Sequence, residues 1–443
     1  MTGDVASTTG VPSEPRERAA FTWRPWLLLG TLVAGYIGIY LCRKNFSVAN
    51  PLIRQAFGLS KEQIGKVASA STLAYMLGKF AFGPLIDRLG GRIAFLLALL
   101  AVAVFGAAGG LVGSLPMLTL VYSLNRLAGS AGWGGMVKQV PDWFPVRSLP
   151  LAMGVLSLGF VFGGVCATLL AGAIADWSGN DWRWVMGGPA TVLAAILVLC
   201  WIVLPRGDAQ AFESKVQSTE LEVAQPARPG FQFRRVADLF TIRRFWIVCA
   251  LSFTLTLLRE TFNTWTVDFF QTTGGAETTS RVAAFLSTPF DALGAVGIVL
   301  MGWVFGRISK PARAWLVFTI LAGLAVLVVA LPTLGARSAW LGMAAVGGIG
   351  FLSYGPYSLL AGVLAVEIRG KEYVATVAGI VDGVGYLAAI LAGQQFGRIL
   401  DLGGYRLGFN CLAALAAASA ILSLFLYSEE TQPQLQPALA AQS

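Results

Sequence analysis

Histidine is absent from the 443 residues of this chain, and charged residues make up only 12% of it. Without histidine, His-based catalytic triads and histidine metal sites are excluded. An ordinary soluble domain has about 25% charged residues. The low charge, together with 56% hydrophobic residues, indicates a chain that lies in a membrane.

Cysteine is also scarce, and its spacing excludes several kinds of site. Five cysteines lie in apolar segments without a CxxC pair, which argues against disulfides and thiolate metal sites. No activated nucleophile or phosphate-cradling glycine loop is found, so we expect no enzyme, no cofactor and no metal. Because no basic face interleaved with aromatics lies outside the apolar segments, the net charge of +9 does not predict a nucleic-acid partner.

Long apolar runs recur along the whole chain. Each can cross a hydrocarbon core of about 30 Å at about 1.5 Å per residue, and none has the alternation of a β-barrel strand. The sequence therefore predicts an all-α integral membrane protein with 12 transmembrane helices. The predicted spans are 25–50, 62–86, 92–112, 117–140, 149–174, 185–205, 245–270, 282–306, 314–332, 338–366, 374–397 and 405–427.

Polar segments divide these spans into two groups of six. The predicted domains are an N-terminal tail (1–24), an N-terminal bundle (25–205), a linker (206–244), a C-terminal bundle (245–427) and a C-terminal tail (428–443). The first 22 residues lack the apolar core and cleavage site of a secretory signal, so we expect an uncleaved first span. More than half of the 32 Lys and Arg fall in loops that are cytoplasmic if both termini are cytoplasmic, which predicts that orientation.

The two groups resemble each other in sequence. "LCRKNF" at 41–46 aligns with "LLRETF" at 257–262, and "GPLIDRLGGR" at 83–92 aligns with "GWVFGRISKPAR" at 302–313. Such a repeat predicts two pseudo-symmetric six-helix bundles with a binding site between them, which is typical of secondary transporters. We expect the lipid bilayer as its surroundings and a monomer as the functional unit.

Two arginines occupy equivalent positions in the repeat. Arg43 lies about 27 Å along the first span and Arg259 about 21 Å along the seventh. A cation at mid-bilayer costs about 2.5–3.5 kcal/mol, so we expect both to face a cavity, where two guanidiniums can clamp an oxyanion. Alternatively, Arg43 and Lys44 lie at the end of a shorter span and reach the interface.

Other polar residues share faces with these cations. Tyr36 and Tyr40 lie on the stripe of Arg43, and Tyr75 and Lys79 form a similar i,i+4 pair in the second span. With Lys44, these side chains are predicted to bind a small anionic substrate. The alternative for the tyrosines is a role in packing.

Acids also occur inside the spans, namely Glu260, Asp268, Asp291, Glu367 and Asp382. Any of them could neutralise an arginine in the empty carrier or carry a proton. Asp291 and Asp382 lie deepest and are the stronger candidates. Arg126 in "SLNRLAGSAGWGG" could be held by one of these acids.

The motif between spans two and three resembles the major facilitator superfamily. The residues that carry this resemblance are Gly83, Asp87, Arg88, Gly90 and Arg92, with Gly302 and Arg307 in the second half. The resemblance implies that the motif holds conformational states, as a latch between helix ends.

Within that superfamily, "YLCRKNFSVANP", "LAYMLGKF" and "LLRETFNTW" resemble the organophosphate:inorganic phosphate antiporters. The resemblance implies that Arg43 and Arg259 form a phosphate site and that the protein exchanges an organophosphate for phosphate by alternating access in a bacterial inner membrane. Phe160 replaces a family histidine, and Glu260, Arg126 and Asp382 are additions. These departures leave open a proton-coupled carrier of a carboxylate such as a sugar acid, or a transport-inactive sensor of a sugar phosphate.

Overall fold

The computed structural model describes the two helical halves of the chain and parts of the connections. The described residues are 23–140, 143–144, 149–205, 238–273, 278–360, 364, 367–368 and 374–427. Within them the regular elements are helices and no strand is found. Of the predicted tails and linker, residues 1–22, 206–237 and 428–443 lie outside the described residues.

The N-terminal half is formed by α1 (Trp23–Phe57), α2 (Lys61–Leu89), α3 (Gly91–Gly109), α4 (Leu115–Gln139), α5 (Leu149–Trp177), α6 (Trp182–Gly187) and α7 (Pro189–Val203). The first helix continues beyond the predicted span, through Pro51 to Phe57. α2 begins with a capping box, in which the Ser60 hydroxyl accepts from Gln63 N and the Gln63 side chain accepts from Ser60 N. The predicted sixth span is divided between α6 and α7.

The C-terminal half is formed by the short 3₁₀ helix η2 (Asp238–Thr241) and by α10 (Arg243–Thr273), α11 (Ser280–Ser287), α12 (Pro289–Phe305), α13 (Lys310–Arg337), α14 (Ala339–Leu360), α16 (Val374–Leu391) and α17 (Gln394–Ser423). The chain bends inside α17 at Gly403 and Gly404, and the latter has φ of 64°, which glycine adopts without steric cost. Each predicted span overlaps a helix, although the eighth span is divided between α11 and α12.

Eight of the described helices or joined helix pairs are long and apolar enough to cross a membrane. α2, α4, α14 and α16 are not among these eight. They carry polar side chains toward the centre of the molecule, including Lys79, Arg126 and Tyr354. Polar residues lower the mean hydropathy of a helix, so hydropathy alone does not identify α2, α4 and α14 as membrane spans.

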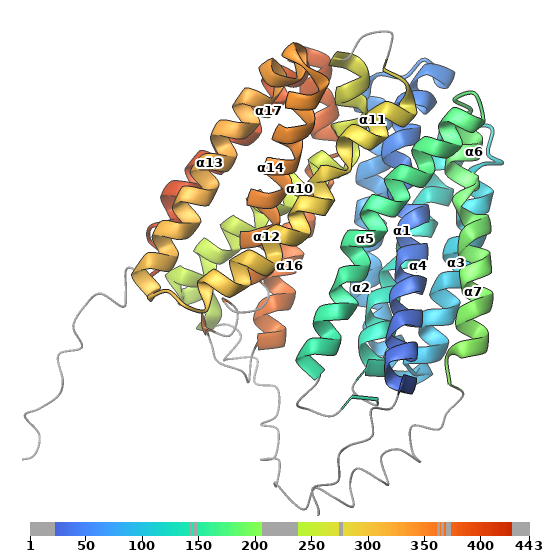
Figure 1. Cartoon of the computed structure of the whole chain (residues 1–443), viewed down its shortest axis with the longest axis horizontal. Helices are drawn as coiled ribbons and strands as arrows, with labels where there is room; N and C mark the ends of the chain where they lie inside the picture. Colours follow the sequence, from blue (N-terminus) through green and yellow to red (C-terminus); the bar gives the residue numbers. More distant parts are fainter. Residues whose placement is uncertain are drawn as a thin grey trace, which may run out of the picture.

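The two halves lie side by side (Figure 1). We call the end where α1 begins the Trp23 end, which is at the bottom of Figure 1, and the opposite end the Phe57 end. The ribbons of the halves approach each other toward the Phe57 end, where α11 packs on α5 and α17 on α2, and they diverge toward the Trp23 end.

Glycine permits the close approach of α2 and α17 near the Phe57 end. A Cβ atom at Gly65 would lie 2.5 Å from the carbonyl oxygen of Gly393. At Gly397 it would lie 2.3 Å from the carbonyl oxygen of Lys61. Both distances are far below van der Waals contact, so these backbones touch only because the side chain is a hydrogen.

Charged groups also join the halves near the Phe57 end. Asp268 of α10 is 1% exposed and forms ion pairs with Arg54 of α1 and, at 2.9 Å, with Lys61 of α2. Between described residues, no hydrogen bond or ion pair joins the halves on the Trp23 side of the contact between Lys79 and Asp382. The structure is therefore closed at its Phe57 end, and among the described residues the polar contacts between the halves extend from there to the pair of Lys79 and Asp382.

Candidate substrate-binding site

A cavity of about 260 Å³ lies between the two halves. It receives side chains from α1, α2, α4 and α5 of one half and from α10, α12, α14 and α16 of the other. The ionisable residues that line it are Tyr36, Tyr40, Arg43, Lys44, Tyr75, Lys79, Tyr122, Arg126, Arg259, Glu260, Asp291, Tyr354, Tyr357, Asp382 and Tyr386. All seven residues that the sequence predicts to bind substrate are among them.

Helical spacing brings the predicted stripe of α1 to the cavity. The rings of Tyr36 and Tyr40, one turn apart, have centroids separated by 5.3 Å. The Arg43 guanidinium lies 5.1 Å from the ring centroid of Tyr40 and 4.8 Å from that of Tyr75 on α2. Arg43 therefore lies inside the protein, between aromatic rings, rather than at a membrane interface.

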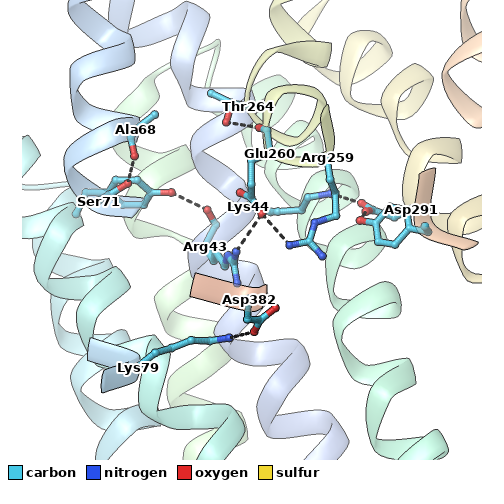
Figure 2. A network of polar contacts seen from close by, with 12 residues as sticks. Arg43, Lys44, Ala68, Ser71, Lys79, Arg259, Glu260, Thr264, Asp291 and Asp382 are labelled. Carbon is cyan, nitrogen blue, oxygen red and sulfur yellow. Dashed lines mark hydrogen bonds and ion pairs between the residues drawn. The ribbon is translucent and has the colours of Figure 1, made fainter. Parts of the chain in front are cut away.

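Glu260 lines the cavity and lies between the two arginines (Figure 2). Its Oε1 is 3.6 Å from Nη2 of Arg43 and 3.3 Å from Nη2 of Arg259. The three side chains are only 10–13% exposed. One carboxylate oxygen thus contacts guanidinium groups from both halves, which is the geometry of an oxyanion clamp.

Two further ion pairs cross the cavity. Lys44 pairs with Asp291 of α12, whose other oxygen accepts a hydrogen bond of 2.7 Å from the Tyr354 hydroxyl. Lys79 pairs with Asp382 of α16 at 3.3 Å. In the sequence repeat, Lys44 aligns with Glu260, so equivalent positions carry opposite charges and each points to the other half.

Sequence reasoning missed several aromatic residues of the cavity, among them Tyr357 and Tyr386. The ring of Tyr357 faces the guanidinium of Arg259, with 4.1 Å between the guanidinium and the ring centroid. The ring centroid of Tyr386 lies 4.6 Å from the Lys79 ammonium. Tyr357 belongs to the quoted "YGPY" element, and Tyr386 follows Asp382 by four residues. Helical spacing from these known positions could have identified both.

Arg126 of α4 lines the same cavity. The structure brings none of the described acids into an ion pair with Arg126.

Phe160 occupies the position at which the resembling family has histidine. Its ring lies nearly parallel to the ring of Tyr354, with 6.5 Å between the ring centroids.

Two predicted acids lie away from the cavity. Asp268 belongs to the Phe57 end. Glu367 binds Arg244 and, at 2.6 Å, Arg313, and accepts a hydrogen bond of 2.9 Å from the Tyr427 hydroxyl. These contacts join elements of the C-terminal half to one another, so Glu367 stabilises that bundle.

The conformational loop motif lies at the Trp23 end. Arg92 Nε donates to the carbonyl oxygen of Leu204 at 3.1 Å, and Arg88 is exposed. Gly90, with φ of 82°, forms the turn between α2 and α3. The contacts of Gly83 and Asp87 lie outside the described part of the structure.

The second copy of the motif joins α12 to α13. Arg307 donates from Nη1 to the carbonyl oxygen of Trp303 at 2.9 Å, and its guanidinium lies 4.2 Å from the Trp303 ring centroid. A Cβ at Gly302 would meet nothing within 4 Å. Arg92 and Arg307 therefore contact their own halves, and the motif residues whose side chains the structure describes do not line the cavity.

Comparison with known proteins agrees with this architecture. The chain is 26% identical over 426 residues to the probable hexose phosphate transport protein of Chlamydia pneumoniae, covering 91% of this chain and 90% of that protein. It is 25% identical over 416 residues to the membrane sensor protein UhpC of Escherichia coli (92% and 93% covered). It is 26% identical over 423 residues to the probable sulfoacetate transporter SauU of Cupriavidus necator (90% and 93% covered).

Among solved structures, the fold is similar to a bacterial homologue of the human lysosomal transporter Spinster, described as inward-facing and unoccupied. The TM-score is 0.76 at 17% identity, and the match covers 92% of this chain and 98% of that one. The predicted fold class is confirmed. The prediction that the protein is not an enzyme is confirmed as well, because the matching family consists of transporters. Residues 32–393 match the Major Facilitator Superfamily, and this chain belongs to that family of membrane transporters.

Proposed function

We propose that this protein is a secondary active transporter of a small organic anion, which exchanges an organophosphate for inorganic phosphate by alternating access. In this proposal Arg43 and Arg259 bind the phosphate. The observation that carries it is Glu260, whose carboxylate already contacts both guanidiniums, at 3.6 and 3.3 Å. A carboxylate of the protein thus stands where we place the oxyanion.

The two arginines belong to opposite halves, so a movement of one half against the other changes the distance between them. Closing the cavity at its Trp23 end brings two buried like charges closer in a low dielectric, which is unfavourable. An anion bound between them offsets this repulsion. Glu260 alone leaves one of these two charges in excess, whereas a dianion that displaces Glu260 neutralises both guanidiniums. The loaded carrier therefore changes state more readily than the empty one, and exchange is favoured over one-way transport.

The surrounding side chains are proposed to hold the organic part of the substrate. Lys79, Tyr75, Tyr36 and Tyr40 offer an ammonium, hydroxyls and ring faces around the clamp. The distribution of Lys and Arg supports a cytoplasmic Trp23 end, and the similarity to bacterial transport proteins supports a bacterial inner membrane. In that orientation the described structure is closed toward the outside.

Transport in liposomes tests the proposal. We expect liposomes loaded with phosphate to take up radiolabelled phosphate and glycerol 3-phosphate, and unloaded liposomes to take up neither. Arg43→Lys and Arg259→Lys should each slow exchange by about tenfold or more, because an ammonium cannot replace the planar fork. Arg183→Lys, at an exposed position outside the cavity, is the matched control and should exchange normally.

Two other functions have specific support and predict different results in the same assay. The cavity carboxylates Glu260, Asp291 and Asp382 favour proton coupling, which predicts uptake of a carboxylate driven by a pH gradient without internal phosphate. The similarity to a membrane sensor protein favours a sensor, which predicts ligand binding without flux. Either result would contradict phosphate exchange.

A further inference from the structure

Arg126 is a buried cation without an ion-pair partner among the residues that the structure describes, although Glu260 in the same cavity attracts it from beyond ion-pair distance. It is 5% exposed, and its Nε has no hydrogen-bond partner. No described carboxylate forms an ion pair with it. The contact that the structure gives its guanidinium is the ring of Tyr75, with 4.8 Å to the centroid.

The other cavity cations all have carboxylate partners. Lys44 has Asp291, Lys79 has Asp382, and the two clamp arginines share Glu260. Five Lys and Arg and three Asp and Glu line the cavity, so two positive charges are in excess. The pairing places one excess charge on the clamp, whose two guanidiniums share one carboxylate, and the other on Arg126.

The buried charge of Arg126 is unfavourable unless an anionic group pairs with it. Removing a guanidinium from water without pairing it is costly, and contact with one aromatic ring offsets only part of this cost. A purely structural position would be filled more stably by an apolar side chain of similar size. The cost indicates that an anionic group of the substrate pairs with Arg126 when the site is filled.

Arg126 and the clamp are close enough to contact one small molecule. Both Arg43 and Arg126 lie 4.8 Å from the ring centroid of Tyr75, and both line the main cavity and a small recess that adjoins it between α1 and α4. A ligand whose first oxyanion lies in the clamp can therefore place a second acidic group near Arg126.

We infer that the substrate carries two acidic groups, an oxyanion that binds Arg43 and Arg259 and a carboxylate that binds Arg126. This inference rests on the proposed function for the clamp, but it is independent of whether the first oxyanion is a phosphate or a sulfonate. A carboxylate is the matching group because its two oxygens fit the fork of a guanidinium.

Two pairs of probes isolate the carboxylate. Glycerol 3-phosphate and 3-phosphoglycerate differ by a terminal CH₂OH or carboxylate, and so do isethionate and sulfoacetate. Dissociation constants are measured by calorimetry on the purified full chain in detergent. In the wild type, we expect the carboxylate-bearing member of at least one pair to bind about tenfold more tightly, which corresponds to about 1.4 kcal/mol.

Variants at Arg126 then test whether this residue causes the preference for the carboxylate-bearing probe. Arg126→Gln should reduce the ratio of affinities within the pair to about one, and Arg126→Lys should keep part of it because the charge remains. Equal affinities for both members of each pair in the wild type would overturn the inference, even if the Gln variant cannot be purified. An equal loss of affinity for both members in Arg126→Gln would overturn it as well, since that is the result of a general charge or folding effect.

The two probe pairs separate this inference from the proposed function. If sulfoacetate binds better than isethionate while no phosphate compound binds, phosphate exchange is wrong and the role of Arg126 stands. If phosphate and both phosphate esters bind equally well and sulfoacetate binds no better than isethionate, the clamp stands and the role of Arg126 is wrong.

Discussion

At the scale of single residues, the central feature is that the clamp already holds a carboxylate of the protein. In the proposed function, a bound anion competes with Glu260 for the same two guanidiniums. The repeat in the sequence singled out Arg43 and Arg259, because matched segments place matched residues at similar depth. It could not identify this competition, since the direction of the Glu260 side chain depends on the packing of both halves.

Replacing Glu260 tests the competition. Glu260→Gln removes the charge but keeps the shape of the side chain, and leaves both arginines without a counter-charge. We expect the empty protein to lose about 3 kcal/mol of stability, because a buried pair is broken, and phosphate to bind about tenfold more tightly. The rise in melting temperature on adding phosphate should therefore be larger in the variant than in the wild type.

Glu260→Asp is the matched control, because it keeps the charge. Its melting temperature in phosphate should follow the wild type more closely than the Gln variant does. If Glu260→Gln bound phosphate more weakly than the wild type, Glu260 would be part of the binding site and not a competitor of the substrate.

At the scale of helices, close packing closes one end of the molecule. α2 and α17 approach each other at Gly65 and Gly393, where an added methyl group would meet a carbonyl oxygen at 2.5 Å. The sequence shows many glycines, but which of them lie at a contact between the halves follows only from the arrangement of the helices.

Gly65→Ala is expected to separate these helices and to favour the state that is open at the Phe57 end. The measurement is the labelling of a cysteine placed at the cavity residue Ser47, in a protein whose native cysteines are replaced, by a membrane-impermeant thiol reagent applied from the Phe57 side. Labelling should be several-fold faster than without the alanine. Gly30→Ala is the control, since a Cβ there meets nothing within 4 Å; equal labelling of the two would contradict the role of Gly65.

At the scale of the whole molecule, the fold was predictable and the pairing between halves was not. Hydropathy, the linker and the repeat together predict twelve spans in two bundles, because each of these signals is local or periodic. The ion pair of Lys44 with Asp291 joins residues that are 247 positions apart, and a single sequence has no signal for such a contact. For the same reason Asp268 could be identified as an acid inside a span, but not as a link between the halves.

Asp268 provides the test of how the two halves are held in the described state. Its carboxylate binds Arg54 and Lys61 from the other half and accepts a hydrogen bond from the Tyr405 hydroxyl. Asp268→Asn leaves two cations of one half facing an uncharged group. Breaking a buried pair costs about 3 kcal/mol or more, which corresponds to about a hundredfold change in the equilibrium between states.

We therefore expect Asp268→Asn to open the Phe57 end, to speed the labelling of the cysteine at Ser47 from that side, and to slow phosphate exchange. The control is Asp176→Asn, which removes another ion pair between the halves. In this pair Asp176 lies 3.0 Å from Arg281, and the two side chains are 46% and 65% exposed, respectively. Exposed pairs contribute about 1 kcal/mol or less, so this variant should label and exchange like the wild type. If the two variants behaved alike, closure of the Phe57 end would depend on helix packing, with the buried charges of Asp268 and its partners contributing little.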